Sequence, residues 1–325
     1  MKARIHHPTA ANLRYLAGVL RRGGLVAIPT ETVYGLAAHA LDAKACRAIF
    51  RAKGRPANDP LIVHVLDLAQ AEALAEFNDE ARRLARVFWP GPLTLVLPKK
   101  ACVPDIVTSG GTTVALRAPA HPLARTLLQR SGVPLAAPSA NPFSYISPTS
   151  AEHVRQGLGS RIAHILDGGE CAIGVESTVL DLTVPQRPRI LRPGAIAAAQ
   201  LVRVLRRKVS VVRSPAGRGA RLLAPGLLER HYSPRTPLRL TSRPGEPDAA
   251  TAVIFLRRPG AKTGAGAYWL SRRGALAEIA RNLYRVLREA DAGGHRLIQV
   301  EKLPPTAGGL AAAINDRLKR AAAKR

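Results

Sequence analysis

Cysteine, aromatic and acidic residues are all scarce in this sequence. The three cysteines, at positions 46, 102 and 171, lie far apart and form no C-x-x-C pair. This argues against a disulfide framework or a zinc knuckle and favours a reducing compartment. Phe, Trp and Tyr make up 4% of the 325 residues, and no interleaved aromatic and basic motif for stacking on nucleic-acid bases is present.

Long apolar runs and the common nucleotide and hydrolase motifs are also missing. His6-His7-Pro8 stands where a signal peptide would need an apolar core, and no charge-free stretch approaches membrane-spanning length. The sequence has no G-x-x-x-x-G-K-[ST] loop, no G-x-S-x-G elbow and no H-E-x-x-H. We therefore expect a cytoplasmic protein without membrane contact. Any ATP would have to be bound by a phosphate-binding loop of another type.

Basic residues, by contrast, are abundant. Lys and Arg number 49 against 22 Asp and Glu, which gives a formal net charge of +27. A field of this sign attracts polyanions such as RNA, DNA or an anionic membrane without any specific site. The same charge would also result from a genomic base composition that favours Arg and Ala, or from a solvated surface with no partner.

The apolar pattern predicts alternating helices and strands. A helix over residues 9–22 places Leu13, Leu16 and Leu20 on one face, with Thr9 as its cap. Short apolar strands are predicted at residues 25–28, 61–65, 93–97, 114–117, 135–137, 162–166, 179–182 and 189–191. We expect an α/β domain over residues 1–205, a linker or lid rich in Arg, Pro, Gly and Ser over 206–247, and a small α/β domain over 248–325.

Several polar segments follow predicted strands, where α/β folds place ligand-binding loops. Lys53 and Arg55 point the same way in an extended backbone and would offer two cations to phosphates. Residues 138–141, P-S-A-N, add a hydroxyl and an amide, and residues 147–150, S-P-T-S, precede a predicted helix whose N-terminus attracts anions. Taken alone, each segment also has a plainer interpretation as a polar turn, a solvated basic face or a helix cap.

Read together, these segments resemble the family of L-threonylcarbamoyladenylate synthases, in the long form that has a C-terminal domain. The resemblance is carried by the order of eight motifs: P-T-E-T-V-Y-G-L from residue 29, K-G-R-P-x-x-x-P-L-I-V-H-V from 53, W-P-G-P-L-T from 89, V-A-L-R-A-P from 114, P-S-A-N from 138, S-P-T from 147, E-S-T-V from 176 and L-R-P-G from 191. The long form is indicated by residues 224–226, 231–234 and 311–318.

The resemblance implies a fold and a set of site residues. The fold would be a twisted, mixed α/β sheet around a basic cavity, followed by a smaller Rossmann-like α/β domain. Lys53 and Arg55 would be catalytic. L-threonine would lie near Thr32, His64, Arg117, Ala137 and Ser177. ATP would lie along Lys53, Arg55, Asp59, Thr113, Ser139, Asn141, Ser147, Arg192, His231 and Tyr232. Asp59 departs from the family, which more often has a neutral or basic residue there, and Phe143 and Tyr145 are bulkier than the small residues typical of their loop.

The implied reaction joins L-threonine, bicarbonate and ATP into L-threonylcarbamoyladenylate and pyrophosphate, with Mg²⁺ accompanying ATP and no direct protein ligand to the metal. The product would serve threonylcarbamoyl modification of adenosine 37 in tRNAs that read ANN codons, through downstream threonylcarbamoyl-transferase proteins. The protein could also bind tRNA or double-stranded RNA. Two rivals are a purely nucleic-acid-binding protein and a carbamoyl-transferring maturation enzyme, although the latter normally carries zinc-binding segments for which this chain lacks cysteines.

Overall fold

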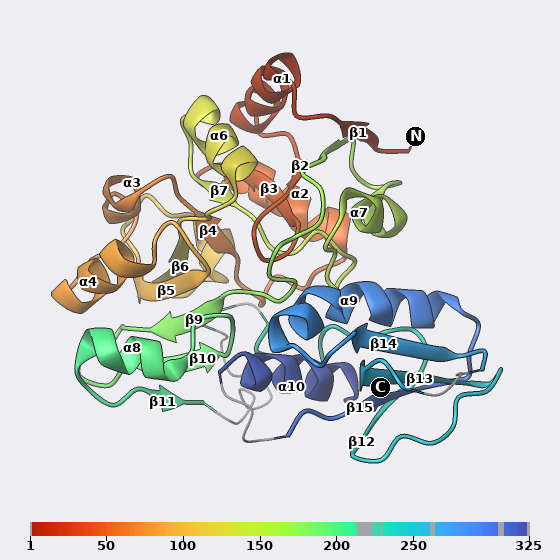
Figure 1. Ribbon diagram of the computed structural model, residues 1–325. Helices are drawn as coiled ribbons and strands as arrows, with labels where there is room; N and C mark the ends of the chain where they lie inside the picture. The colour runs from red at the N-terminus through yellow and green to blue at the C-terminus, as the bar shows by residue number, and fades with distance from the viewer. Residues whose placement is uncertain are drawn as a thin grey trace.

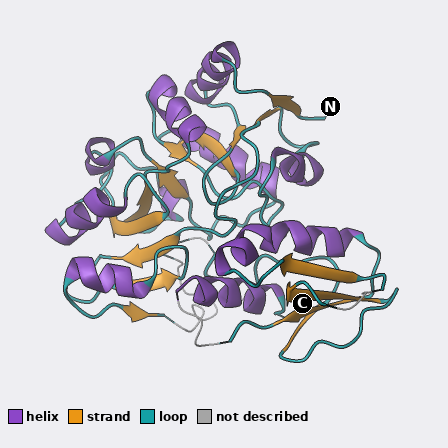
Figure 2. Ribbon diagram, viewed as in Figure 1, coloured by secondary structure: helices purple, strands orange, loops and turns teal. Residues whose placement is uncertain are grey.

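The computed structural model describes residues 2–212, 223–224, 226–228, 230–260, 264–304 and 309–323. These residues form two sheets with helices packed around them (Figures 1 and 2). The larger sheet is mixed and has eleven strands in the order β1-β8-β2-β3-β7-β4-β6-β5-β9-β10-β11, and the smaller has four strands in the order β12-β15-β13-β14. The predicted α/β class, with a mixed sheet and a second sheet, is confirmed.

The first eleven strands lie within the N-terminal two thirds of the chain. Their bounds are β1 Arg4–His6, β2 Val26–Ile28, β3 Gly35–His39, β4 Ile62–His64, β5 Leu93–Pro98, β6 Thr113–Arg117, β7 Leu135–Ala136, β8 His164–Leu166, β9 Thr178–Asp181, β10 Arg189–Arg192 and β11 Ser210–Val211. The accompanying helices are α1 Ala10–Arg21, α2 Ala43–Lys53, α3 Leu68–Glu72, α4 Asp79–Phe88, α5 Asp105–Thr108, α6 Pro122–Ser131, α7 Ala151–Leu158 and α8 Ala198–Leu205.

The second sheet is entirely parallel. It consists of β12 Leu238–Thr241, β13 Thr251–Arg257, β14 Ala267–Ser271 and β15 Leu297–Glu301, with helices α9 Leu276–Ala292 and α10 Gly309–Ala321. The range predicted as a linker contains β11 and β12, which have too few residues to produce a recognisable periodic pattern. Pro225, part of the predicted long-form signature, lies outside the described residues.

Local sequence signals account for several helix boundaries. The side chain of Thr9 accepts a hydrogen bond from the Asn12 N–H and so caps α1 as predicted. Asp67 and Asn78 cap α3 and α4 in the same way. Ser150 caps α7, directly after the S-P-T segment. Strands β1, β3 and β14 were not predicted, because β1 has only three residues, β3 consists largely of buried small residues, and the exposure along β14 does not alternate.

The N-terminal and C-terminal parts of the chain share one hydrophobic cluster. Val33, Ile146 and Val175 of the N-terminal part pack together with side chains of α9, α10 and the second sheet. Helix α9 lies between its own sheet and the N-terminal part (Figure 1). Gly174 allows this close approach, since a Cβ built there would lie 2.4 Å from the Ala280 carbonyl oxygen of α9. Among the described residues, no helix has the length and apolar character needed to cross a membrane.

Candidate active site

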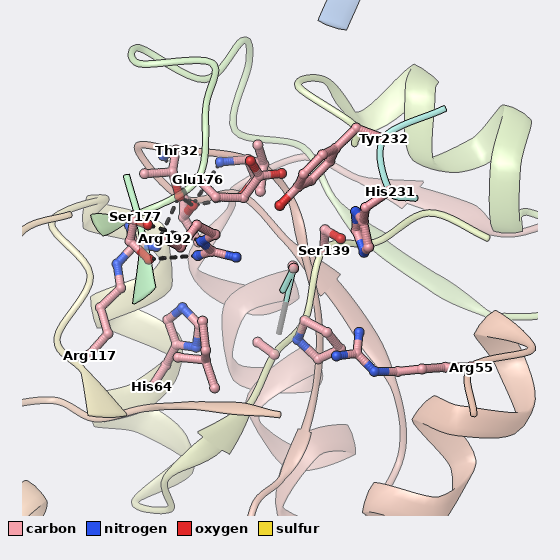
Figure 3. A pocket seen from close by; sticks show the side chains of 17 residues that line it. Thr32, Arg55, His64, Arg117, Ser139, Glu176, Ser177, Arg192, His231 and Tyr232 are labelled. Atoms are coloured by element: carbon pink, nitrogen blue, oxygen red, sulfur yellow. Dashed lines mark hydrogen bonds between the residues drawn. The ribbon is translucent and has the colours of Figure 1, made fainter. Parts of the chain in front are cut away.

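A cavity opens where strands β4 and β6 of the larger sheet end, beside β9 and β10. His64 and Arg117 are register partners on the neighbouring parallel strands β4 and β6, so both side chains come to the same edge, as expected for ligand sites in α/β sheets. Ten predicted site residues line the cavity together (Figure 3): Thr32, Arg55, His64, Arg117, Ala137, Ser139, Ser177, Arg192, His231 and Tyr232.

The free space inside this cavity is small. It amounts to about 40 Å³, whereas sites for small molecules commonly measure about 300–1,000 Å³. The residues of the linker that line it, Gly226, His231 and Tyr232, close it from one side. Figure 3 shows the His231 and Tyr232 rings across the pocket from His64 and Arg117. The structure therefore represents a closed form with room for little more than water.

Arg117 is fixed by three neighbours at one end of the cavity. Its Nη1 donates to Thr32 Oγ1 at 3.0 Å and its Nε donates to the Gly91 carbonyl at 3.2 Å. Its Nη2 lies 2.7 Å from Glu31 Oε1, which makes a buried ion pair. Burial acts to raise the pKa of Glu31, but Arg117 outweighs it and holds the pKa below its usual value. Glu31 therefore remains ionised and keeps the guanidinium oriented.

His64 sits beside Arg117 as a neutral ring. Burial, assisted by the positive charge of Arg117, lowers the pKa of His64 to about 3. Its Nδ1 is buried and has no hydrogen-bond partner among the described residues. An unsatisfied buried polar atom is costly unless a ligand completes it. The His64 ring therefore offers a hydrogen-bonding position to a molecule in the cavity.

Arg55 and Asp59 form a second buried ion pair at the other end of the cavity. Arg55 Nη2 lies 2.9 Å from Asp59 Oδ2, and the same guanidinium donates to the carbonyls of Asp59 and Pro60 at 3.0 and 2.8 Å. Burial raises the pKa of Asp59 despite this partner. Asp59 itself does not line the cavity. In this closed form it holds the guanidinium that was predicted to bind phosphate.

Lys53 is the last residue of helix α2 and does not stand in the extended backbone that was expected for it, because the helix continues until Gly54 ends it in the left-handed conformation. Unlike Arg55, it lies just behind the cavity wall. Its Nζ donates to the carbonyl oxygens of Ser139 and Asn141, at 2.5 and 2.6 Å. Burial and the neighbouring Arg55 lower the pKa of Lys53 well below its usual value. The lysine thus anchors the P-S-A-N segment, and it is this segment that presents Ser139 to the cavity.

Three further predicted residues also stand outside the cavity wall. The Asn141 amide donates to the carbonyls of Pro142 and Tyr145, and so shapes the loop that follows. Ser147 donates to Glu176 Oε1 at 2.6 Å. Thr113 begins β6, at the opposite end of that strand from Arg117. The sequence therefore identified residues that line the cavity as well as residues that support its wall.

Glu176 is a charged residue that lines the cavity and is absent from the predicted site residues. It belongs to the quoted E-S-T-V motif, yet only Ser177 of that motif was assigned to the site. Burial acts to raise the pKa of Glu176, but Arg317, Arg192 and hydrogen bonds from Ser147 and Arg317 lower it to about 2. The signal that could have identified it is an acidic residue in a buried motif of an otherwise basic site.

The linker contributes an aromatic pair to the cavity. The rings of His231 and Tyr232 lie 4.1 Å apart, and Phe143 meets His231 edge-on at 6.2 Å. Ser144, at the centre of that loop, has a φ of 61° and accepts a hydrogen bond from the Ser233 N–H at 2.8 Å. The Tyr232 hydroxyl is buried and has no hydrogen-bond partner among the described residues. The bulky 143–145 loop thus supports residues 231–233.

Comparisons with known proteins agree with this geometry. Residues 18–194 match the Sua5/YciO/YrdC family model, described as telomere recombination, and residues 196–323 match the model of the threonylcarbamoyl-AMP synthase C-terminal domain. The chain is 42% identical to the threonylcarbamoyl-AMP synthase of Pyrococcus abyssi, over 96% of this chain and 94% of that protein. It is also 42% identical to the Bacillus subtilis threonylcarbamoyl-AMP synthase, over 95% of this chain and 92% of that protein.

Solved structures give the same result. The crystal structure of P. abyssi Sua5 complexed with L-threonine superposes with a TM-score of 0.88 at 39% identity, and the match covers 98% of each chain. Two family models account for nearly the whole chain, and the P. abyssi relative covers 96% of it. The chain therefore belongs to the threonylcarbamoyl-AMP synthase family of enzymes, in the form that includes the C-terminal domain.

Proposed function

We propose that this protein forms L-threonylcarbamoyladenylate and pyrophosphate from L-threonine, bicarbonate and ATP. The threonine amine attacks bicarbonate and releases water, or it attacks CO₂ formed by dehydration of bicarbonate and loses a proton; either route leaves a carbamate. A carbamate oxygen then attacks the α-phosphorus of ATP, and pyrophosphate leaves. The observation that carries the proposal is the convergence of Arg55, Arg117 and Arg192 on one lid-covered cavity. Three guanidinium groups suit a reaction that brings together the carboxylate of an amino acid, bicarbonate and a polyphosphate, and whose transition state carries negative charge on the phosphates.

We place L-threonine at the end of the cavity formed by Thr32, His64 and Arg117. A solved relative at 39% identity is complexed with L-threonine, which supports this choice of amino acid. Arg117 would bind the substrate carboxylate, because Glu31 and Thr32 already hold its guanidinium at the cavity wall. The neutral His64 ring would accept or donate one hydrogen bond, and Ala137 and Ser177 would complete the enclosure.

ATP would occupy the side lined by Arg55, Ser139, Arg192 and Tyr232. Phosphate entry would draw Arg55 away from Asp59, because a polyphosphate carries more charge than one carboxylate. The unpaired Tyr232 hydroxyl would then gain a partner among the oxygens of the nucleotide. The nucleotide would not touch Lys53, Asn141 or Ser147 directly, and these residues would act by holding the loops that contact it. Only a nucleotide bound in an extended conformation would reach Thr113.

Magnesium would enter with the nucleotide. Among the described residues, no group of three or more His, Cys, Asp or Glu side chains could hold a metal ion. The carboxylates nearest the cavity, Glu31, Asp59 and Glu176, each face an arginine. The donors present therefore fit an ion coordinated by ATP phosphates and water rather than by side chains. Its contribution would be to offset phosphate charge.

The linker would serve as a lid. The free space of about 40 Å³ is smaller than ATP and threonine need, so the 231–232 pair would move away to admit them and then return. Closing it over the substrates would exclude water from a product that hydrolyses readily. In the pathway implied by the resemblance, a threonylcarbamoyl transferase would consume this product to modify adenosine 37 of tRNA, and the charge of +27 is compatible with contact with tRNA or double-stranded RNA.

The test is product formation by the full chain. ATP, Mg²⁺, L-threonine and bicarbonate are incubated with the protein, and the products are followed by mass spectrometry together with pyrophosphate release. We expect a threonylcarbamoyl adenylate whose formation requires both threonine and bicarbonate. Pyrophosphate release that does not depend on threonine, or no release at all, would contradict the proposal.

A further inference from the structure

The proposed reaction leaves one sequence signature without a role. Residues 311–318, A-A-A-I-N-D-R-L, belong to α10, far from the catalytic motifs along the chain. Arg317 of this helix is 1% exposed. Its side chain crosses into the N-terminal part, where its Nε donates to Glu176 Oε2 at 2.7 Å across a separation of 141 residues. A buried charge at this depth needs such a partner.

Glu176 receives hydrogen bonds from both parts of the chain. Besides Arg317, the Tyr284 hydroxyl of α9 donates to Oε2 at 2.9 Å. Ser147 of the N-terminal part donates to Oε1 at 2.6 Å. Glu176 also lines the cavity, so its carboxylate connects the cavity wall directly to α9 and α10.

The same C-terminal residues enclose the lid tyrosine. The Arg317 guanidinium carbon lies 5.2 Å from the centroid of the Tyr232 ring, a cation–π distance. Tyr284 stacks on Tyr232 with centroids 5.8 Å apart and an interplanar angle of 26°. Tyr232 has a φ of 62°, a backbone conformation that a tyrosine adopts only when its surroundings hold it there.

A neighbouring residue of α10 holds the lid backbone. The His231 N–H donates to the Arg320 carbonyl at 3.3 Å, and the Arg320 side chain donates to the Leu228 carbonyl. Asp316 joins the two arginines, since its oxygens lie 2.7 Å from Arg317 and 3.1 Å from Arg320. One helix turn thus contacts the cavity wall, the lid ring and the lid backbone.

We propose that Arg317 is a positioning residue through which the C-terminal domain sets the equilibrium between the open and closed lid. Arg317 and Tyr284 form the surface onto which the Tyr232 ring returns after each opening. Because Glu176 fixes the Arg317 guanidinium, this surface stays in place while the lid is away. The role in turnover rests on the proposed function, whereas the role in closing the lid rests on the contacts alone.

The test compares Arg317→Met with Arg285→Met. Arg285 is a matched control, because it lies on α9 and pairs with Glu289 on the surface. Hydrogen exchange of the 230–236 segment is measured by mass spectrometry on the full chain without ligands. We expect exchange about tenfold faster for Arg317→Met and unchanged exchange for Arg285→Met. Unchanged protection of the segment in Arg317→Met would overturn the proposal.

Two more variants separate positioning from folding. Arg317→Met combined with Glu176→Gln leaves no unpaired buried charge and should keep the fold while the lid still exchanges faster. Arg317→Lys keeps a cation and should restore part of the protection.

If the wild type forms no adenylate but the exchange results hold, the proposed function fails and the lid contact stands. If the wild type is active, we expect kcat/KM for ATP to fall about tenfold in Arg317→Met, and an unchanged value would refute the role in turnover.

Discussion

Replacing Glu176 by Gln removes one charge from the buried cluster that joins the two parts of the chain. The glutamine keeps the size of the side chain, but its single amide oxygen can accept from Ser147 or from Tyr284 and not from both, because an NH₂ group replaces the second oxygen. It loses the charge that faces Arg317 at 2.7 Å. The variant therefore removes the charge and one acceptor from this cluster, with little change in packing, and the pH dependence of its stability identifies the part that is due to the charge.

The expected magnitude follows from the shift in the pKa of Glu176. The pKa falls from 4.5 to about 2 on folding, which corresponds to about 3 kcal/mol of stability, at about 1.4 kcal/mol for each tenfold change in proton affinity. Because the folded-state pKa is the lower one, this contribution is complete above about pH 5 and disappears as the pH falls through the interval between 4.5 and 2. At pH 3 about 2 kcal/mol of it should be gone.

Urea unfolding of the wild type and Glu176→Gln at pH 7, 5, 4 and 3 checks this expectation. We expect the variant to be about 3 kcal/mol less stable at pH 7 and the difference to shrink toward pH 3. Glu289→Gln is the control, since Glu289 forms an exposed pair with Arg285 and such pairs contribute about 0–1 kcal/mol. A difference that is the same at pH 3 and pH 7 would refute the reasoning, as would the absence of a difference at pH 7.

Three further substitutions test the proposed site. Arg117→Met should raise the KM for L-threonine about 100-fold, because the variant loses a charge-assisted contact to the threonine carboxylate. The KM for ATP should change much less. Equal effects on the two KM values in steady-state kinetics would contradict the placement of threonine beside Arg117. Lys53→Ala should abolish adenylate formation, and wild-type turnover in this variant would exclude a catalytic role for Lys53. Because the substitution leaves two buried carbonyls without their donor, thermal unfolding should also show that the protein loses about 2 kcal/mol of stability. Tyr232→Phe keeps the ring and should preserve the protection of the 230–236 segment from hydrogen exchange. The KM for ATP should rise about fivefold, because the hydroxyl that would bind the nucleotide is missing. An unchanged KM would show that the hydroxyl does not reach the nucleotide.

The site residues were predicted from the order of the family motifs, whereas the local sequence pattern predicted the strands and helix caps that carry some of them. His64 and Arg117 end apolar strands that the sequence pattern identified, and parallel strands carry their final residues to one sheet edge. Caps such as Thr9 and Ser150 act within three residues. Contacts of this range depend on the nearby chain alone, so pattern and spacing reveal them.

Other features depend on residues that the sequence does not bring together. Nothing near Lys53 indicates that its ammonium group binds the P-S-A-N carbonyls, 86 and 88 residues away, rather than facing the cavity. The Arg55–Asp59 pair is close in sequence, yet its burial is decided by the packing around it.

The sequence by itself determined the α/β class, the family resemblance and the set of chemical groups around the site. Only the tertiary structure decided that Arg317 of the C-terminal helix meets Glu176 of a catalytic motif, 141 residues earlier, and that the lid tyrosine packs between the two parts of the chain. The physical reason is the separation of the interacting residues along the chain. Helix caps and strand alternation are set by neighbouring residues, whereas a buried ion pair between distant segments is set by the packing of whole helices and sheets.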